Sequence, residues 1–151
     1  TAQSKHSDAI KVMQFNMLAD GLSGAYSMHQ DDKHFLGVDK ECLQWTYRGL
    51  RLCEEIVRFD PDIVCLQECD QILFLMQYLT RFGYESYHQH SGDTVQKVAK
   101  KLSKERGQDV HMVDLNVAIL VKSERFSVTG RIQKIDKARN KANVVGLCVP
   151  L

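Results

Sequence analysis

Proline and long apolar runs are scarce in this chain of 151 residues. It holds only two prolines, and its longest uninterrupted apolar stretches are Ile72–Met76 and Val117–Val121. These stretches fall far short of the roughly 20 residues that a membrane-spanning helix needs. The first eight residues, TAQSKHSD, contain no apolar segment of the kind found in secretory signal peptides. We therefore expect no membrane partner and an intracellular, cytoplasmic protein, with the nucleus or a mitochondrion as alternatives.

The chain also has no large excess of charge of either sign. It contains 20 Lys and Arg and 19 Asp and Glu, which gives a net charge of +1. With 44% apolar residues, this balance excludes an intrinsically disordered chain and predicts one packed domain. The charge is nevertheless unevenly distributed. Residues 1–92 hold 8 basic and 13 acidic side chains, whereas residues 93–151 hold 12 and 6. The basic second part favours either an anionic partner such as RNA or a solvated basic face.

The five cysteines are an odd number, and several lie inside apolar runs such as Val64–Leu66 and Leu147–Val149. Buried, reduced thiols are the expectation for such positions in an intracellular protein.

The first half of the chain has the hydrophobic pattern of a β-α-β unit. Alternating residues predict a strand at Ile10–Phe15, and apolar residues at helical spacing predict a helix over Leu43–Phe59 that ends before Pro61. The continuous apolar run Ile63–Leu66 is typical of a strand that is covered on both faces. A second helix is expected from Asp70, as its N-cap, to about Phe82, with Gly83 closing it.

The second half of the chain is predicted to be mainly extended. Strands are expected at Tyr84–His88, Val117–Val121, Phe126–Ile132 and Val144–Val149. Residues 93–107 have apolar positions on one face and lysines around it, which predicts a basic helical insertion between strands. The sequence therefore predicts an α/β fold in which a mixed sheet opens with a β-α-β unit and carries helices on one face. Because the last apolar strand is followed only by Pro150 and Leu151, we expect residues 1–151 to be an incomplete domain.

Polar side chains follow the two strands of the predicted β-α-β unit. Asn16 comes after the first strand, and Gln67 and Glu68 come after the second. Because parallel strands bring their carboxyl ends to one edge of a sheet, these side chains are expected to share a crevice there. A carboxylate suits Mg²⁺ or Mn²⁺, and an amide suits a phosphate oxygen or a metal-bound water. The alternatives are that the N-terminus of the following helix stabilises the Glu68 carboxylate, and that Asn16 is a turn residue whose side chain bonds its own backbone.

Two segments in this order resemble motifs of the endonuclease/exonuclease/phosphatase superfamily. KVMQFNMLAD, which contains Asn16, is similar to its opening motif, and DPDIVCLQECD, which contains Glu68, is similar to its second motif. The intervening LQWTYR and EEI resemble the branch that contains nocturnin, the Angel proteins and the carbon catabolite repressor-type deadenylases. The resemblance covers most of the chain but only the N-terminal half of the family domain, and so implies the front half of a four-layer α/β sandwich.

The resemblance implies roles for two residues. Glu68 would be a catalytic residue and the metal ligand, and Asn16 a catalytic residue near the metal and the scissile phosphate. The superfamily's later Gly-Asp-x-Asn and Ser-Asp-His motifs are missing from this chain. Those motifs supply the water-activating Asp and the acid/base His, and general-base help alone is worth about 10²–10⁴-fold. Residues 1–151 alone are therefore expected to be nearly inactive.

The implied activity is Mg²⁺-dependent phosphodiester hydrolysis, with Mn²⁺ as a substitute, by a 3′-exoribonuclease of the poly(A) deadenylase type. Its partners would be poly(A) RNA and proteins of a deadenylase complex. One alternative is a nocturnin-like phosphatase that acts on a phosphorylated dinucleotide such as NADPH. Another is a truncated, non-catalytic module that binds RNA or a protein partner.

Overall fold

The structure of the chain is a computed structural model that describes residues 9–20, 23, 37–89, 116–139 and 142–151. At residues 89, 134–139 and 142–147 it describes the backbone only. The basic helix expected at 93–107 lies outside the described residues. The helices and strands, in chain order, are β1 (Val12–Asn16), α1 (Lys40–Leu43), α2 (Trp45–Phe59), β2 (Ile63–Gln67), α3 (Ile72–Leu79), the 3-10 helix η3 (Thr80–Phe82), β3 (Tyr84–Gln89), β4 (Val117–Lys122), β5 (Gln133–Arg139) and β6 (Ala142–Cys148).

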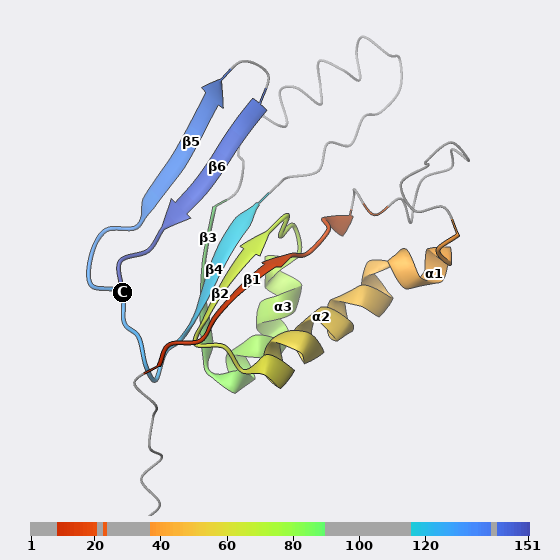
Figure 1. Cartoon of the computed structure of the whole chain (residues 1–151), viewed down its shortest axis with the longest axis horizontal. Helices are drawn as coiled ribbons and strands as arrows, with labels where there is room; N and C mark the ends of the chain where they lie inside the picture. The colour runs from red at the N-terminus through yellow and green to blue at the C-terminus, as the bar shows by residue number, and fades with distance from the viewer. Residues whose placement is uncertain (1–8, 21–22, 24–36, 90–115, 140–141) are drawn as a thin grey trace, which may run out of the picture.

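Four of the strands form one mixed sheet in the order β1-β2-β4-β3. β1 runs parallel to β2, whereas β4 is antiparallel to both β2 and β3. Helices α2 and α3 cover one face of this sheet (Figure 1). β5 and β6 form an antiparallel hairpin on the other side, where β6 contacts β3 and β4. This arrangement confirms the predicted α/β fold with an opening β-α-β unit.

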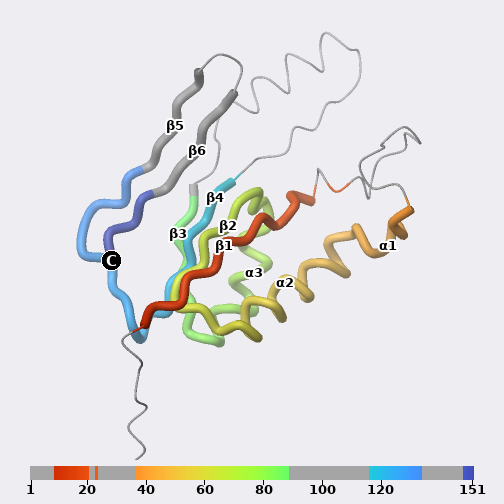
Figure 2. Tube along the Cα trace, in the orientation of Figure 1, coloured from red at the N-terminus to blue at the C-terminus, as the bar shows by residue number. Residues whose placement is uncertain are grey.

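The core lies between the sheet and the two helices. Because side chains alternate along a strand, Val64 and Leu66 of β2 point toward the helices and are almost fully buried. Ile56 of α2 and Leu75 of α3 meet them from the other layer, and both are fully buried. The crossover through α2 thus places β1 and β2 side by side, as the Cα trace shows (Figure 2).

Two of the predicted helix boundaries were wrong. The helix expected over Leu43–Phe59 is divided, because Gln44 is extended with φ −65° and ψ 139° and separates α1 from α2. The next helix begins at Ile72 with Gln71 at its N-cap, so Asp70 lies one residue too early to be that cap. The stop before Pro61 is confirmed. α3 itself ends at Leu79, and the 3-10 helix η3 continues to Phe82, where Gly83 closes it as predicted. Asp60 and Gly83 both adopt a left-handed backbone.

One predicted strand was also wrong. Residues Phe126–Ile132 are irregular chain with a bend at Gly130, and the strand begins at Gln133 instead. β5 has the sequence QKIDKAR, which lacks an apolar run, and it becomes a strand through its pairing with β6. β-structure of this kind depends on the partner strand more than on local propensity.

All five cysteines are free thiols, as expected. Burial raises the pKa of Cys53 to about 11 and that of Cys69 to about 12. Both side chains are therefore protonated at neutral pH and act as small apolar groups in the core. Cys42 and Cys148 are exposed, so the expected burial does not hold for these two.

Candidate active site

Asn16 and Glu68 meet at the carboxyl ends of the two parallel strands. The pairing of β1 with β2 sets Asn16 opposite Gln67, and Glu68 is the next residue. Asn16 Nδ2 donates a hydrogen bond to Glu68 Oε1 over 2.9 Å. The prediction that these two side chains lie close together at one edge of the sheet is therefore confirmed.

Both side chains are held by the loop that follows β1. The backbone N–H of Ala19 approaches Glu68 Oε2 at 3.4 Å, and the N–H of Leu18 donates to Asn16 Oδ1 over 2.9 Å. The bond to Leu18 is the local turn contact considered as an alternative for Asn16. It fixes which end of the amide points toward Glu68, because Oδ1 is occupied as the acceptor and Nδ2 is left to donate.

The backbone at this site has an unusual conformation. Three described non-glycine residues have positive φ, and two of them lie at this site: Glu68 itself at 53°, and Leu18, two residues after Asn16, at 54°. Left-handed backbone is unfavourable for residues with a Cβ atom, and such residues concentrate at functional sites where surrounding contacts hold them. Glu68 thereby leaves the direction of β2 and turns its carboxylate toward Asn16 and Ala19.

A second set of groups anchors the loop itself. Asp20 N donates to Asp70 Oδ2 over 2.8 Å, and the guanidinium of Arg48 in α2 bonds the carbonyls of Met17 and Leu18. Burial raises the pKa of Asp20, while the charge of Arg48 and the backbone N–H of Trp45 oppose that rise. The sequence marked Arg48 only as part of a family-like motif, and no pattern around Asp20 or Asp70 indicated this contact.

The donor set suits a hard cation with few protein ligands. Each oxygen of Glu68 accepts one hydrogen bond and keeps further lone pairs, so the carboxylate has capacity to bind a metal. Within the described part of the chain, no three Asp, Glu, His or Cys side chains gather as a ligand cluster. A single carboxylate with several waters is a common way to hold Mg²⁺, whereas Zn²⁺ would require more protein ligands.

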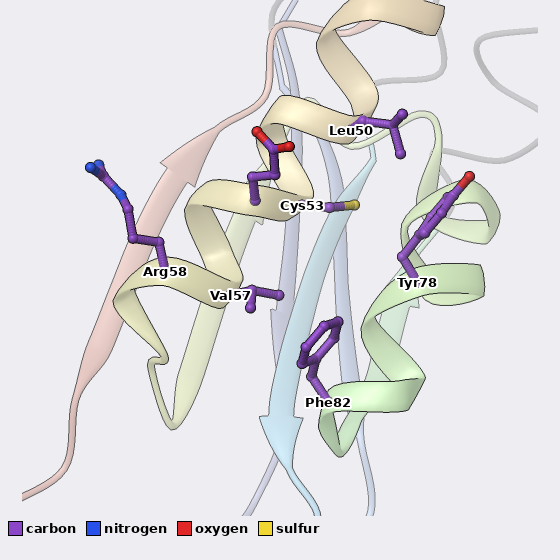
Figure 3. Close-up of a pocket in the computed structure, with 7 residues that line it drawn as sticks. Leu50, Cys53, Val57, Arg58, Tyr78 and Phe82 are labelled. Carbon is purple, nitrogen blue, oxygen red and sulfur yellow. The ribbon is translucent and has the colours of Figure 1, made fainter.

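A separate groove lies between α2 and α3, on the outer side of the helices (Figure 3). It has a volume of about 370 Å³ and is lined by Leu50, Cys53, Glu54, Val57, Arg58, Tyr78 and Phe82. Neither Asn16 nor Glu68 belongs to this lining. The groove is largely apolar and offers no arrangement of groups for hydrolysis.

Fold and site together define a class of protein. It is a layered α/β domain that carries an amide and a carboxylate at the carboxyl edge of its sheet. A sequence profile of the Endonuclease/Exonuclease/phosphatase family matches residues 13–150, and the chain belongs to this family. The chain is 34% identical over 96 residues to Carbon catabolite repressor protein 4 homolog 3 of Arabidopsis thaliana, covering 63% of this chain and 20% of that protein. It is 39% identical over 83 residues to Nocturnin of Mus musculus, covering 54% and 18% respectively.

Two solved structures share the fold. The crystal structure of ANGEL2, described as a 2′,3′-cyclic phosphatase, matches with a TM-score of 0.63 at 20% identity, over 95% of this chain and 40% of that one. The human Nocturnin catalytic domain with a bound sulfate matches with a TM-score of 0.59 at 21% identity, over 93% and 42%. The chain therefore spans about two fifths of these domains and about a fifth of the two relatives named above. Along the described ranges, no helix combines the length and the apolar character that crossing a membrane requires.

Proposed function

We propose that this chain is the N-terminal part of a Mg²⁺-dependent phosphodiester hydrolase, a 3′-exoribonuclease of the poly(A) deadenylase type. The observation that carries the proposal is the contact of Asn16 with Glu68 at the carboxyl ends of β1 and β2. Membership of the Endonuclease/Exonuclease/phosphatase family supports it, as does the 34% identity to a carbon catabolite repressor homologue. Poly(A) RNA and proteins of a deadenylase complex are the proposed partners.

Glu68 and Asn16 would have different roles in the proposed reaction. Glu68 would hold Mg²⁺, or Mn²⁺ in its place, through oxygens whose direction the Asn16 amide and the Ala19 N–H fix. Asn16 has a second N–H on Nδ2, which can donate to an oxygen of the scissile phosphate. When bound, the cation supplies charge stabilisation to the phosphoryl oxygens. The water-activating groups would come from the remaining part of the domain, so we expect residues 1–151 alone to show no turnover.

Removing the charge of Glu68 tests the proposal in the protein that carries its natural downstream sequence. Glu68→Gln keeps the size and one acceptor oxygen but weakens the hold on a divalent cation. We expect loss of hydrolysis of a 5′-labelled oligo(A) by at least about 10²–10⁴-fold, the range typical for one lost catalytic group. The melting temperature should change little.

Glu54→Gln is the matched control, because Glu54 is an exposed residue of α2 that pairs with Arg51 on the helix surface. It makes the same chemical change away from the site and should leave turnover unaltered. Substantial residual hydrolysis by Glu68→Gln would contradict the assignment of Glu68 as the metal ligand.

A phosphatase is the second candidate function. It is favoured by the 39% identity to Nocturnin and by the fold shared with a protein described as a 2′,3′-cyclic phosphatase. The substrate would then be a phosphorylated dinucleotide such as NADPH, or an RNA end. Comparing kcat/KM for oligo(A), NADPH and an oligonucleotide with a 2′,3′-cyclic phosphate decides between the candidates. Release of inorganic phosphate without shortening of oligo(A) would favour the phosphatase.

A further inference from the structure

The loop Met17–Asp20 lies beside the Asn16–Glu68 pair, and two of its residues are buried although they belong to no helix or strand. Met17 is 2% exposed and Ala19 is fully buried. Leu18 between them has the left-handed φ of 54°, a conformation that persists only where neighbouring groups hold it. This loop provides the Ala19 N–H that faces Glu68 and the Leu18 N–H that orients Asn16.

Arg48 is one of the groups that hold this loop from outside, together with the Gln67 carbonyl, which accepts Met17 N–H, and the Asp70 carboxylate, which accepts Asp20 N–H. Its Nη1 donates to the carbonyls of Met17 and Leu18 over 3.0 and 2.9 Å, and its Nε donates to the carbonyl of Leu43 over 2.7 Å. Its Nη2 lies 3.7 Å from Asp20 Oδ1. One guanidinium thus links α1 and α2 to both sides of the left-handed residue.

The side chain of Arg48 is itself fixed in place. Its guanidinium carbon lies 5.5 Å from the centroid of the Trp45 ring, and only 13% of the side chain is exposed. The Trp45 ring meets Phe74 of α3 edge to face at a centroid distance of 5.5 Å. Arg48 therefore connects the loop to the place where α2 packs against α3.

The geometry points to Arg48 as a positioning residue for the Glu68 site, an inference that rests on the proposed function. Arg48 holds the carbonyls of Met17 and Leu18, and this keeps Leu18 left-handed. The N–H groups of Leu18 and Ala19 then orient Asn16 and Glu68 for the cation. Lysine cannot replace it, because an ammonium lacks the planar set of donors that reaches several carbonyls at once.

Arg48→Lys tests this inference in the protein that carries its natural downstream sequence, with Arg51→Lys as the matched control. Arg51 lies one turn away on the exposed face of α2, where it pairs with Glu54. The first measurement is amide hydrogen exchange, which requires neither metal nor substrate. We expect exchange at Leu18 and Ala19 to accelerate at least about tenfold in Arg48→Lys, because bonds from a charged donor are lost. Exchange at the core residue Leu120 should stay slow.

The second measurement is a titration with Mn²⁺ alone, followed by the Mg²⁺ dependence of turnover. Groups behind a metal ligand typically change metal affinity by about 10–100-fold, and we expect an increase of about tenfold in the apparent Kd for Mn²⁺. The Mg²⁺ concentration for half-maximal turnover should rise in parallel, and saturating Mg²⁺ should restore most of kcat. A merely structural role would lower kcat without shifting the metal dependence, and that outcome would overturn the inference.

Unchanged amide hydrogen exchange at Leu18 and Ala19 in Arg48→Lys would also overturn the assignment of Arg48 as a positioning residue. If Arg48→Lys does not fold, Asp20→Asn removes the charge that faces the guanidinium and should shift exchange and metal dependence in the same direction by a smaller factor. The absence of both shifts in a folded Asp20→Asn protein would then count against Arg48. Failure of the proposed function is recognised separately, because the unmodified protein would then show neither Mn²⁺ binding nor hydrolysis.

Discussion

Asp62 lies just before β2, at the end of that strand opposite to Glu68, and it ties three segments together. Its Oδ2 accepts the backbone N–H of Lys11 over 2.8 Å and pairs with Arg125 Nη1 over 2.6 Å. Burial acts to raise the pKa of Asp62, but the Lys11 N–H and the Arg125 guanidinium outweigh it, so the pKa lies below its usual value of 3.8. The carboxylate therefore favours the folded state only in its ionised form.

The stability that Asp62 contributes should depend on pH. Because its folded pKa is below the unfolded value, the contribution is complete above pH 3.8 and is lost as the pH falls through the folded pKa. Asp62→Asn should lower the free energy of unfolding at pH 7 by about 1–3 kcal/mol, the usual cost of disturbing a bond between charged groups. The difference from the unmodified chain should shrink toward pH 3.

Urea unfolding at pH 7, 5 and 3 measures this difference. Glu124→Gln, at an exposed carboxylate, is the control and should have little effect at any of these values. A difference for Asp62→Asn that is as large at pH 3 as at pH 7 would show that the lost contact is not governed by ionisation.

At the scale of the elements, the approach of α2 to α3 depends on Gly49. A Cβ built on Gly49 would lie 2.7 Å from Cε1 of Phe74 and 2.9 Å from Cε2 of Trp45. Both rings belong to the edge-to-face pair that joins the two helices, so they have little freedom to move apart.

Gly49→Ala should therefore destabilise the protein although alanine is the better helix former. The gain in helix propensity is about 1 kcal/mol, and overpacking of a core typically costs about 1–3 kcal/mol. We expect a net loss of up to about 2 kcal/mol, measured as a lower melting temperature and a lower urea midpoint. Thr46→Ala, at an exposed position of the same helix, is the control and should be neutral or slightly stabilising. An increase in stability for Gly49→Ala would show that the Trp45 and Phe74 rings can move to make room for the added methyl group.

The sequence predicted the elements whose pattern is set locally. The apolar alternation before Asn16, the helical spacing up to Phe59 and the continuous run of β2 all led to the correct element types. The extended Gln44 and the charged strand β5 were missed, because the first depends on how α1 and α2 pack and the second on pairing with β6. Tertiary contacts override local propensity at such positions.

The candidate site was predictable to the same extent. Asn16 and Glu68 were found because the ends of parallel strands meet, which is a general property of such sheets. The contributions of Ala19 and Asp70 could not be predicted from the sequence. Each acts through a single hydrogen bond to a residue about 50 positions away in the chain. The left-handed φ of Glu68 has no sequence signature, because glutamate rarely adopts that conformation.

At the scale of the whole molecule, the face of the sheet away from α2 and α3 is less well covered than the core. Val12 of β1 is 64% exposed there, whereas Val64 and Leu66, which face the helices, are almost completely buried. In the described sheet β1 is also an edge strand, so one row of its backbone N–H and C=O groups has no neighbouring strand. An exposed apolar residue on a strand edge favours pairing with another chain.

This edge should govern the behaviour of residues 1–151 expressed alone, which we expect to aggregate as concentration rises and to bind a dye for apolar surfaces. Val12→Lys should reduce that aggregation, because a lysine on an edge strand opposes pairing with a second edge. Stability should change by no more than about 0.5 kcal/mol, since an exposed side chain loses little packing. Light scattering over a concentration series and the thermal transition measure the two effects. Thr46→Lys adds the same charge to the exposed surface of α2, so equal suppression by both variants would show that net charge, and not the β1 edge, controls association.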